Sequence, residues 1–247
     1  MLRVEAVMGT TISVQISDPL PPPQLADVAD ETFAFLHAVD ARFSTYRADS
    51  EVSRLNAGSL SAQSPSSDLR EVLTRCTSLW HRTNGYFDAY ASGKLDPSGF
   101  VKGWAAQVAS DRLFAAGARN HCVNAGGDVR VRGFSSPGEP WRVGVRHPFE
   151  PAAMCCVVVG TDLAVATSGV YERGRHVLDP FTGRPSMGLR SVTVAGPDLG
   201  EADGLATAAL AMGLSGIDWL STLDGHSSAV ITDDGRFLCS DAFPLTD

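Results

Sequence analysis

The 247-residue sequence is poor in charged side chains, which make up only 19% of it, whereas 44% of its residues are hydrophobic. This composition excludes an intrinsically disordered chain, because disorder requires low hydrophobicity and high charge. Basic residues are in the minority, and the formal net charge is −8. A protein that binds nucleic-acid phosphates or anionic lipid would carry a basic face. The charge balance therefore disfavours both partners, although one local pocket can still bind a small anionic ligand.

Long hydrophobic runs are missing as well. No stretch reaches the roughly 18 apolar residues that a membrane-spanning helix needs. The first residues read MLRVEAVMGTTISVQIS, and Arg3 and Glu5 interrupt them before any apolar run approaches the length of a signal peptide. We therefore expect no membrane span, no signal peptide and no lipobox, and we expect the protein to act in the cytoplasm.

Familiar cofactor and metal motifs are also absent. No GxxxxGK[ST] pattern occurs and no GxGxxG follows a predicted strand, so neither a P-loop nor a Rossmann site is supported. The cysteines are odd in number and match no zinc-binding spacing. We interpret them as small buried hydrophobic residues of a reducing compartment, with a catalytic thiol as the alternative. The five are Cys76, Cys122, Cys155, Cys156 and Cys239.

The hydrophobic pattern predicts helices in the first half of the chain. Residues 4–16 alternate and are rich in β-branched side chains, which predicts one strand. Apolar residues then recur three and four positions apart, as on one face of a helix. Helices are expected at about 25–43, at 67–80 and from 98 onward.

Short strand-like runs separated by Gly and Pro dominate the second half. They lie at 121–124, 129–132, 141–146, 155–159 and 192–194. Helices are expected at 201–212 and 217–223, and a final hairpin is expected to pair 229–232 with 237–239. The sequence therefore predicts one α+β domain over residues 1–247, with helices packed on a mainly antiparallel sheet.

Two glycine-containing segments are candidates for ligand contact. In Asn124–Asp128 (NAGGD), two glycines allow close approach of a ligand, and adjacent amides in such a turn can point at an anion. In Ala166–Gly169 (ATSG), hydroxyls beside a glycine suit a phosphate or the edge of a flavin ring. Each segment taken alone is better explained as an ordinary turn without a ligand.

Asp203 and Thr207 are four residues apart, so a helix places both on one face. A carboxylate and a hydroxyl are hard oxygen ligands of the kind that Mg²⁺ takes, alongside waters and substrate phosphate. The alternative is a helix-capping Asp followed by a Thr that hydrogen-bonds back to its own helix.

His176 begins the segment HVLDPFTGRP, in which a turn bounded by prolines could place His176 and Asp179 as an acid–base pair at the mouth of a pocket. A lone His is more often structural. Upstream, LDPSGFVKGW at 95–104 is typical of a loop that leads into a helix N-terminus, where backbone amides and the helix dipole favour anions.

Taken in order, these segments resemble the ApbE family of FAD:protein FMN transferases over about nine-tenths of the chain. The matching segments are Met8–Thr10 (MGT), Phe43–Tyr46 (FSTY), Asp49–Asn56 (DSEVSRLN), Gly85–Asp88 (GYFD), Lys102–Ala105 (KGWA), Gly126–Asp128 (GGD), Thr167–Gly169 (TSG), His176–Pro185 (HVLDPFTGRP), Ser191–Val194 (SVTV) and Asp203–Thr207 (DGLAT).

The resemblance implies an ApbE-like, T-fold-like arrangement of layers that binds FAD with Mg²⁺. It also implies transfer of FMN from FAD to a Thr or Ser hydroxyl of an acceptor protein, with release of AMP. Metal ligands would be Asp203, Thr207 and a backbone carbonyl near Gly99. Asp203 would also be catalytic, and His176 is a candidate base. Residues near the cofactor would be Met8, Tyr46, Asn56, Asp88, Lys102, Gly126, Gly127, Asp128, Thr167, Ser168 and Gly169.

The sequence departs from the family pattern between Asp88 and Lys102, where many relatives carry a long insertion. Asp96-Pro97 also stands where the family has Asp-Leu. These departures bear on the activity more than on the fold. Two alternatives therefore stay open beside the transferase: an FAD pyrophosphatase that yields FMN and AMP, and a protein that binds FAD without turning it over.

Overall fold

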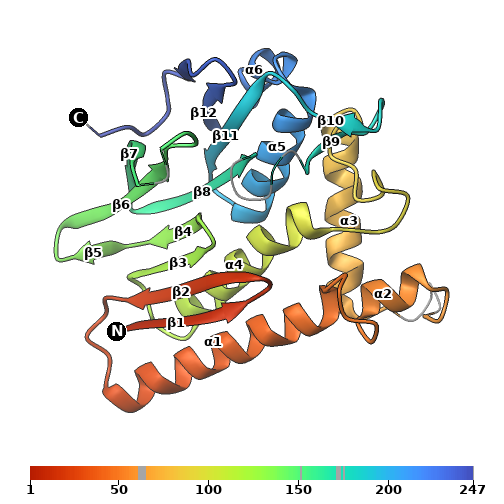
Figure 1. The fold of residues 1–247 in the computed structure, drawn as a ribbon. Coiled ribbons are helices and arrows are strands. Elements are labelled where there is room, and N and C mark those ends of the chain that lie inside the picture. Colours follow the sequence, from red (N-terminus) through yellow and green to blue (C-terminus); the bar gives the residue numbers. More distant parts are fainter. Residues whose placement is uncertain (61–64, 151, 171–173, 175, 247) are drawn as a thin grey trace.

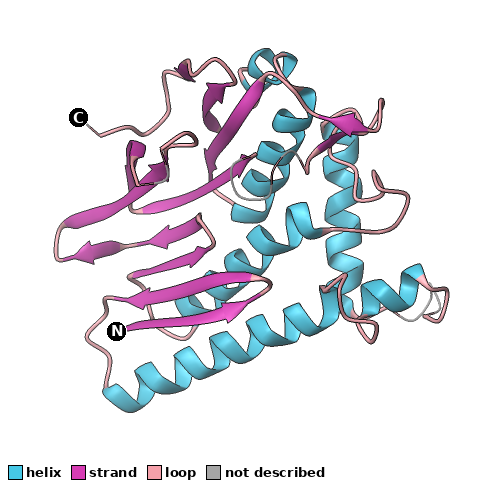
Figure 2. Cartoon of the chain, viewed as in Figure 1, coloured by secondary structure: helices cyan, strands magenta, loops and turns pink. Residues whose placement is uncertain are grey.

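The computed structural model describes residues 1–60, 65–150, 152–170, 174 and 176–246. Its main sheet has eight strands in the order β1-β2-β3-β4-β8-β11-β12-β13, and helices gather along one side of it (Figures 1 and 2). Neighbouring strands all pair antiparallel. The bounds are β1 Leu2–Val7, β2 Thr10–Ile16, β3 His121–Ala125, β4 Asp128–Arg132, β8 Asp162–Gly169, β11 Leu189–Gly196, β12 Ser227–Thr232 and β13 Phe237–Cys239.

Two smaller sheets and six described helices complete the fold. The small sheets are β5 Phe134–Ser136, β6 Glu139–Arg146 and β7 Met154–Gly160, and β9 Leu178–Asp179 with β10 Arg184–Pro185. The helices are α1 Pro22–Phe43, α2 Glu51–Asn56, α3 Ser67–Arg82, α4 Ser98–Ala115, α5 Leu199–Met212 and α6 Ser215–Leu220. The expected fold class, helices packed on a mainly antiparallel sheet, is confirmed. None of these helices combines the length and hydropathy needed to cross a membrane.

The predicted single strand over 4–16 is wrong, because the chain turns back at Met8 and Gly9 to form the β1–β2 hairpin. Both residues have positive φ, 53° and 69°, as a tight two-residue hairpin turn requires. A methionine is seldom found in this left-handed conformation, so Met8 is a weak signal for a turn.

Five elements were not predicted, and one of them matters for the site. Helix α2 and strands β5, β9 and β10 are short, but β8 lies at the centre of the main sheet, between β4 and β11. The segment Ala166–Gly169, expected at a turn, forms the last half of this strand. Its Ala, Ser and Gly residues are weak strand formers, which explains the miss. Helix α6 also ends at Leu220 rather than at 223.

The alternation along the central strands separates two hydrophobic clusters. Ala166 of β8 and Val194 of β11 face the helices and belong to the larger cluster. Their neighbours Val165 and Ala195 face the other way, where Trp141 and other residues of the β6–β7 hairpin cover them. Period-two burial therefore gives the sheet one helix-covered face, and the site lies on that face.

Helices α4 and α5 lie against the sheet and against each other, and α1 and α3 pack on their outer sides. Glycines permit the close crossing. A Cβ atom on Gly103 would lie 2.5 Å from the carbonyl oxygen of Leu199 and 2.8 Å from Cβ of Asp203. A Cβ on Gly200 would lie 3.1 Å from the backbone of Trp104. The two backbones thus approach more closely than side chains at these positions would allow.

We expect Gly103→Ala to destabilise the protein by about 1–3 kcal/mol, because the added methyl group overpacks the crossing. Gly99→Ala is the matched control in the same helix, since its Cβ would meet only side-chain atoms at ordinary contact distances, those of Thr207 at 3.4 and 3.5 Å and of Phe87 at 3.7 Å. Urea unfolding of both variants in metal-free buffer measures the difference. Equal stability of the two variants would show that the crossing has room to relax.

His121 of β3 is buried in its neutral form against α4. Its Nε2 lies 2.7 Å from the Ser110 hydroxyl and its Nδ1 lies 2.7 Å from the Ala118 carbonyl oxygen. Burial lowers the pKa of His121 to about 4, from an ordinary value of 6.5. Between these pH values the unfolded chain binds more protons than the folded one, so stability falls as the pH drops.

We therefore expect His121→Gln, which cannot titrate, to flatten the acid side of the stability profile. From pH 6.5 down to 4, the wild type should lose up to about 3 kcal/mol more than the variant. Denaturant melts across this range give the two curves. Parallel curves would mean that His121 titrates alike in the folded and unfolded states.

Candidate functional site

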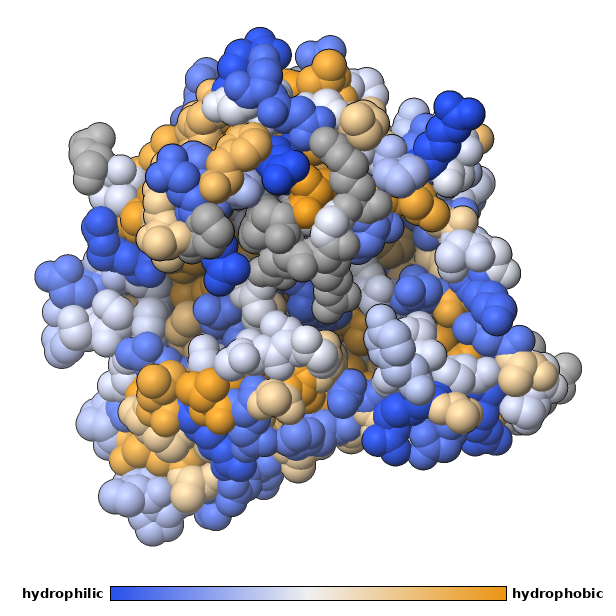
Figure 3. Space-filling view, in the orientation of Figure 1, coloured by the Kyte–Doolittle hydropathy of each residue, from blue (hydrophilic) through white to orange (hydrophobic). Residues whose placement is uncertain are grey.

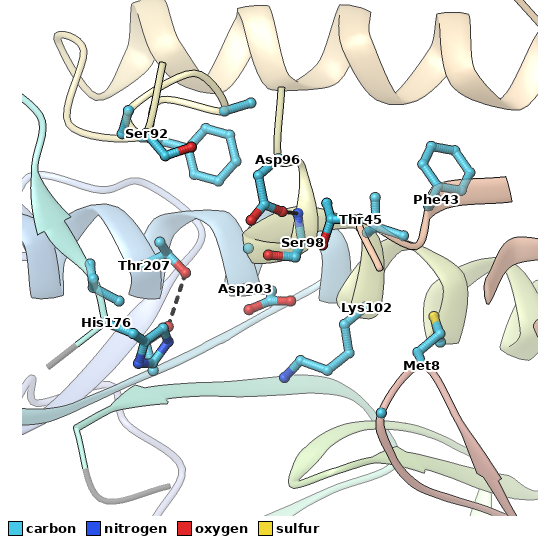
Figure 4. A pocket seen from close by; sticks show the side chains of 18 of the residues that line it. Met8, Phe43, Thr45, Ser92, Asp96, Ser98, Lys102, His176, Asp203 and Thr207 are labelled. Atoms are coloured by element: carbon cyan, nitrogen blue, oxygen red, sulfur yellow. Dashed lines mark hydrogen bonds between the residues drawn. The ribbon is translucent and has the colours of Figure 1, made fainter. Parts of the chain in front are cut away.

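A cavity of about 600 Å³ opens on the helix-covered side of the sheet, where the β1–β2 turn, the end of α1, the start of α4, α5 and the ends of β8 and β9 meet. The space-filling view shows hollows near the middle of this face, bordered by both polar and apolar residues (Figure 3). The close view shows Thr207 and His176 toward one end of the cavity and Met8 and Phe43 toward the other, with Asp203 and Lys102 between them (Figure 4).

Asp203 is the most deeply placed ionisable group of the cavity, with only 3% of its surface exposed. The α4–α5 crossing places it beside Gly103, whose backbone N–H donates to Oδ2 over 3.1 Å. Burial raises the pKa of Asp203 to about 7, and the negative charge of Asp128 adds to the rise, while Lys102 and the Gly103 amide oppose it. The site thus contains a carboxylate that a cation would stabilise.

Lys102, which lines the cavity, forms an ion pair with Asp128 behind it. Asp128 is buried, and its Oδ1 accepts a hydrogen bond of 2.9 Å from the backbone N–H of Thr167. The ion pair therefore ties α4 to β4, and the backbone bond ties β4 to β8. This arrangement holds the lysine side chain next to Asp203 without leaving the Asp128 charge uncompensated.

Thr207 lies one turn after Asp203 on α5, so both point to the same side of the helix. Its hydroxyl is 3.0 Å from the Ser168 hydroxyl on β8. A Cβ on Gly99 would meet the Thr207 side chain at 3.4 Å. The expected helical pair is therefore present, next to the first turn of α4.

The groups around Asp203 and Thr207 that could bind a metal ion are few, and all of them are oxygen donors. No cluster of three or more His, Cys, Asp or Glu side chains suited to a metal occurs in the part of the chain that the structure describes. The Gly103 N–H, which in a regular helix points at the carbonyl of Gly99, also lies within hydrogen-bond reach of Asp203. One carboxylate, one hydroxyl and that carbonyl suit Mg²⁺, which retains waters and binds substrate phosphates.

Most of the predicted site residues do line the cavity. They are Met8, Tyr46, Asp88, Gly99, Lys102, Gly126, Thr167, Ser168, Gly169, His176, Asp203 and Thr207. The hydroxyl of Thr167 points to the opposite face of the sheet, 2.9 Å from the Thr193 hydroxyl. Thr167 therefore lines the cavity with other atoms than its hydroxyl. Several lining residues were not predicted, among them two carboxylates, Asp40 on α1 and Asp96 before α4.

Three predicted residues lie outside the cavity lining: Asn56, Gly127 and Asp128. Asn56 exchanges two hydrogen bonds of 2.9 Å with the backbone of Leu95, so it holds the loop that leads into α4. The two amides expected to face an anion are used internally instead. Gly126 N–H donates to the Thr11 carbonyl over 3.1 Å and Gly127 N–H to the Asn124 side chain over 2.8 Å.

The expected pairing of His176 with Asp179 is not observed among the described residues. The Asp179 carboxylate accepts hydrogen bonds of 2.9 Å from the Phe181 N–H and the Thr182 hydroxyl, which closes the β9–β10 turn. His176 lines the cavity instead, with Nδ1 3.0 Å from the Gly174 carbonyl oxygen. A short Asp-Pro-Phe-Thr-Gly turn satisfies its own carboxylate, which the sequence pattern alone did not reveal.

Comparison with known proteins gives consistent matches. The model of the ApbE family matches residues 8–93 and 89–231. A FAD:protein FMN transferase of Vibrio cholerae serotype O1 is 36% identical over 129 residues, which are 48% of this chain and 39% of that protein. One of Haemophilus influenzae is 26% identical over an alignment of 273 positions, which covers 83% of this chain and 79% of that protein. One of Rhodobacter capsulatus is matched over only 30% of its own length, at 36% identity.

Solved structures match over nearly the whole chain. The flavin transferase ApbE from Vibrio cholerae superposes with a TM-score of 0.87 at 25% identity, covering 100% of this chain and 99% of that one. The apo form of the Pseudomonas stutzeri flavinyl transferase ApbE gives a TM-score of 0.81 at 26% identity, covering 97% and 93%.

The raised pKa of Asp203 generates a prediction about stability. A carboxyl group with a folded pKa of about 7 and an ordinary value of 3.8 favours the folded state in its protonated form, so stability falls as the pH rises through that window. We expect Asp203→Asn to be more stable than the wild type at pH 8 without metal, and to differ much less at pH 4.

Thermal melts with a chelator and with added Mg²⁺ test both parts of this expectation. Mg²⁺ should raise the melting temperature of the wild type at pH 8, because it binds only the folded protein, and should leave Asp203→Asn unchanged. The same Mg²⁺ response in both proteins would remove Asp203 as a ligand.

Proposed function

The chain belongs to the ApbE family, and from this membership and its site we propose that it transfers the FMN half of FAD to a Thr or Ser hydroxyl of an acceptor protein, releasing AMP. The family resemblance expected from the sequence is thereby confirmed. In this reaction the acceptor oxygen forms a bond to the phosphorus of the FMN half. The bond from that phosphorus to the bridging oxygen breaks, and the hydroxyl proton leaves.

The observation that carries the proposal is the placement of Asp203 and Thr207 opposite the first turn of α4. Ser98 and Gly99 line the cavity from that turn, and the N-terminus of a helix attracts phosphate through its amides and dipole. A pyrophosphate placed here would lie between the helix end and the oxygen donors of α5. FAD presents such a group midway along its length.

Asp203, Thr207 and the carbonyl of Gly99 are the residues that would hold Mg²⁺. When bound, the ion would neutralise pyrophosphate charge and act as a Lewis acid. Asp203 supplies the one full negative charge of this set. The Ser168 hydroxyl orients Thr207 through their 3.0 Å hydrogen bond, and Lys102 supplies a fixed positive charge beside the same corner.

The two ends of the cavity suit the two remaining tasks. Met8 and Phe43 give apolar surface at the far end, where we propose that the flavin ring binds, and Tyr46 lies beside them with 96% of its surface exposed. His176 lies at the Thr207 end, where we propose that it accepts the proton of the attacking hydroxyl. Residues 1–247 would then form one flavin transferase domain.

The test uses purified protein, FAD, Mg²⁺ and a degenerate peptide library with one fixed Thr. AMP release together with a peptide mass gain equal to FMN would support the transferase. We expect Asp203→Asn to lower AMP release by roughly 100-fold or more, because several kcal/mol of charge stabilisation depend on the metal. Thr207→Ala should also be slow, whereas Thr207→Ser keeps the hydroxyl and should retain most of the activity.

Other outcomes would point to the alternatives. AMP release with no labelled peptide would identify an FAD pyrophosphatase. Stoichiometric FAD binding with no AMP release would identify a binding protein and contradict the proposal. Full activity of Asp203→Asn would leave the reaction in place and refute the metal assignment.

A further inference from the structure

Three aromatic side chains gather at the rim of the cavity, on two segments far apart in the sequence: Trp80 and Tyr86 on one, and Phe181 on the other. The Phe181 ring, at the tip of the β9–β10 turn, packs edge-on against Tyr86, with ring centroids 4.9 Å apart at 68°. Gly85 separates Phe181 from Trp80 of α3, since its Cβ would lie 3.3 Å from the first ring and 3.5 Å from the second. The glycine therefore leaves a notch between two aromatic rings.

The cluster is continuous with the cavity. Tyr86 lines the cavity and also contacts Phe181, and Leu178, at the base of the same hairpin, lines it too. Strand β9 also packs on α5, the helix that carries Asp203 and Thr207. In Figure 1 the β9–β10 hairpin extends from the α5 side of the site toward α3. A molecule that enters at this end of the cavity would pass the aromatic rings.

The turn holds Phe181 outward. Asp179 fixes the backbone through its carboxylate bonds to the Phe181 N–H and Thr182 hydroxyl, and its carbonyl accepts from the Gly183 N–H over 2.8 Å. Phe181 is nevertheless 66% exposed and Trp80 46% exposed. The Phe181 ring therefore contributes little buried area to the packing of the turn. Exposed aromatic residues set in a pocket are typical anchors for a protein partner.

We propose that Phe181 and Trp80 bind an apolar side chain of the acceptor polypeptide, close in sequence to the hydroxyl that receives FMN. This inference rests on the proposed function, because that reaction brings a polypeptide to this end of the cavity. A small flavin substrate is bound within the cavity and does not account for rings outside it. A lipid surface is disfavoured as occupant by the net charge of −8.

The proposal makes Phe181 a positioning residue that selects the acceptor and takes no part in the chemistry. Its loss should raise the KM for the acceptor and leave FAD binding and kcat nearly unchanged, since Phe181 does not line the cavity in which FAD is proposed to bind. Loss of one aromatic anchor at a binding surface typically weakens binding by roughly tenfold or more.

The experiment compares the wild type with Phe181→Ala, Phe181→Tyr and Phe237→Ala, using FAD, Mg²⁺ and a degenerate nonapeptide library with a fixed central Thr. Phe237 on β13 is the matched control, being an exposed phenylalanine, 39% exposed, that does not line the cavity. Mass spectrometry identifies which peptides gain FMN. Flavin fluorescence titration gives the affinity for FAD, and AMP release without peptide gives the rate of hydrolysis.

We expect wild-type labelling to favour peptides with an apolar residue near the Thr. Phe181→Ala should lose this preference and label roughly tenfold less at low peptide concentration, while Phe181→Tyr and Phe237→Ala should behave as the wild type. FAD affinity and peptide-free hydrolysis should be equal in all four proteins.

Two results would overturn the inference while leaving the proposed function intact. One is unchanged peptide preference in Phe181→Ala, and the other is an equal loss of FAD binding and peptide labelling, which would show a structural role. A wild type that releases no AMP and labels no peptide would instead refute the proposed function, and this inference with it.

Discussion

The site depends on the close crossing of α4 and α5. Gly103 allows the helix backbones to approach until its amide reaches the Asp203 carboxylate, which leaves no room for water between them. That approach removes Asp203 from solvent and raises its pKa. It also places Thr207 against the first turn of α4. A packing constraint between two apolar helices therefore creates both the charge and the geometry of the cavity.

Charge within the site is distributed over three elements of the structure. Lys102 belongs to a helix, Asp128 to a strand beneath it, and Asp203 to the neighbouring helix. Two carboxylates share one ammonium group, so the metal-free site has an excess negative charge that lowers stability. This excess negative charge favours binding of a cation. The proposed magnesium ion would supply the compensating positive charge.

The sequence allowed prediction of those features that follow from a repeated hydrophobic pattern or from the spacing between residues. Long apolar faces placed α1, α3, α4 and α5, and the four-residue interval placed Asp203 and Thr207 together. It failed where one residue carried the information, as at the Met8 turn, or where tertiary contact decided the outcome. Asp40 comes from a helix with no local signal of a site, and Asp96 from a loop in which the sequence did not single out the carboxylate; only the folded chain brings both to the cavity. Asp179 pairs with its own turn for a reason equally invisible in the pattern.

The double hydrogen bond between Asn56 and Leu95 joins residues 39 positions apart, and Ala89 accepts a further bond of 2.7 Å from Asp96. These bonds fix the end of the loop independently of its course after Ala89. Extra residues could therefore be inserted between the two anchors without shifting the start of α4. Loop length can therefore vary in this architecture: a longer cover over the cavity can be gained or lost in evolution, or grafted by design, while Asp203, Thr207 and the start of α4 stay in place.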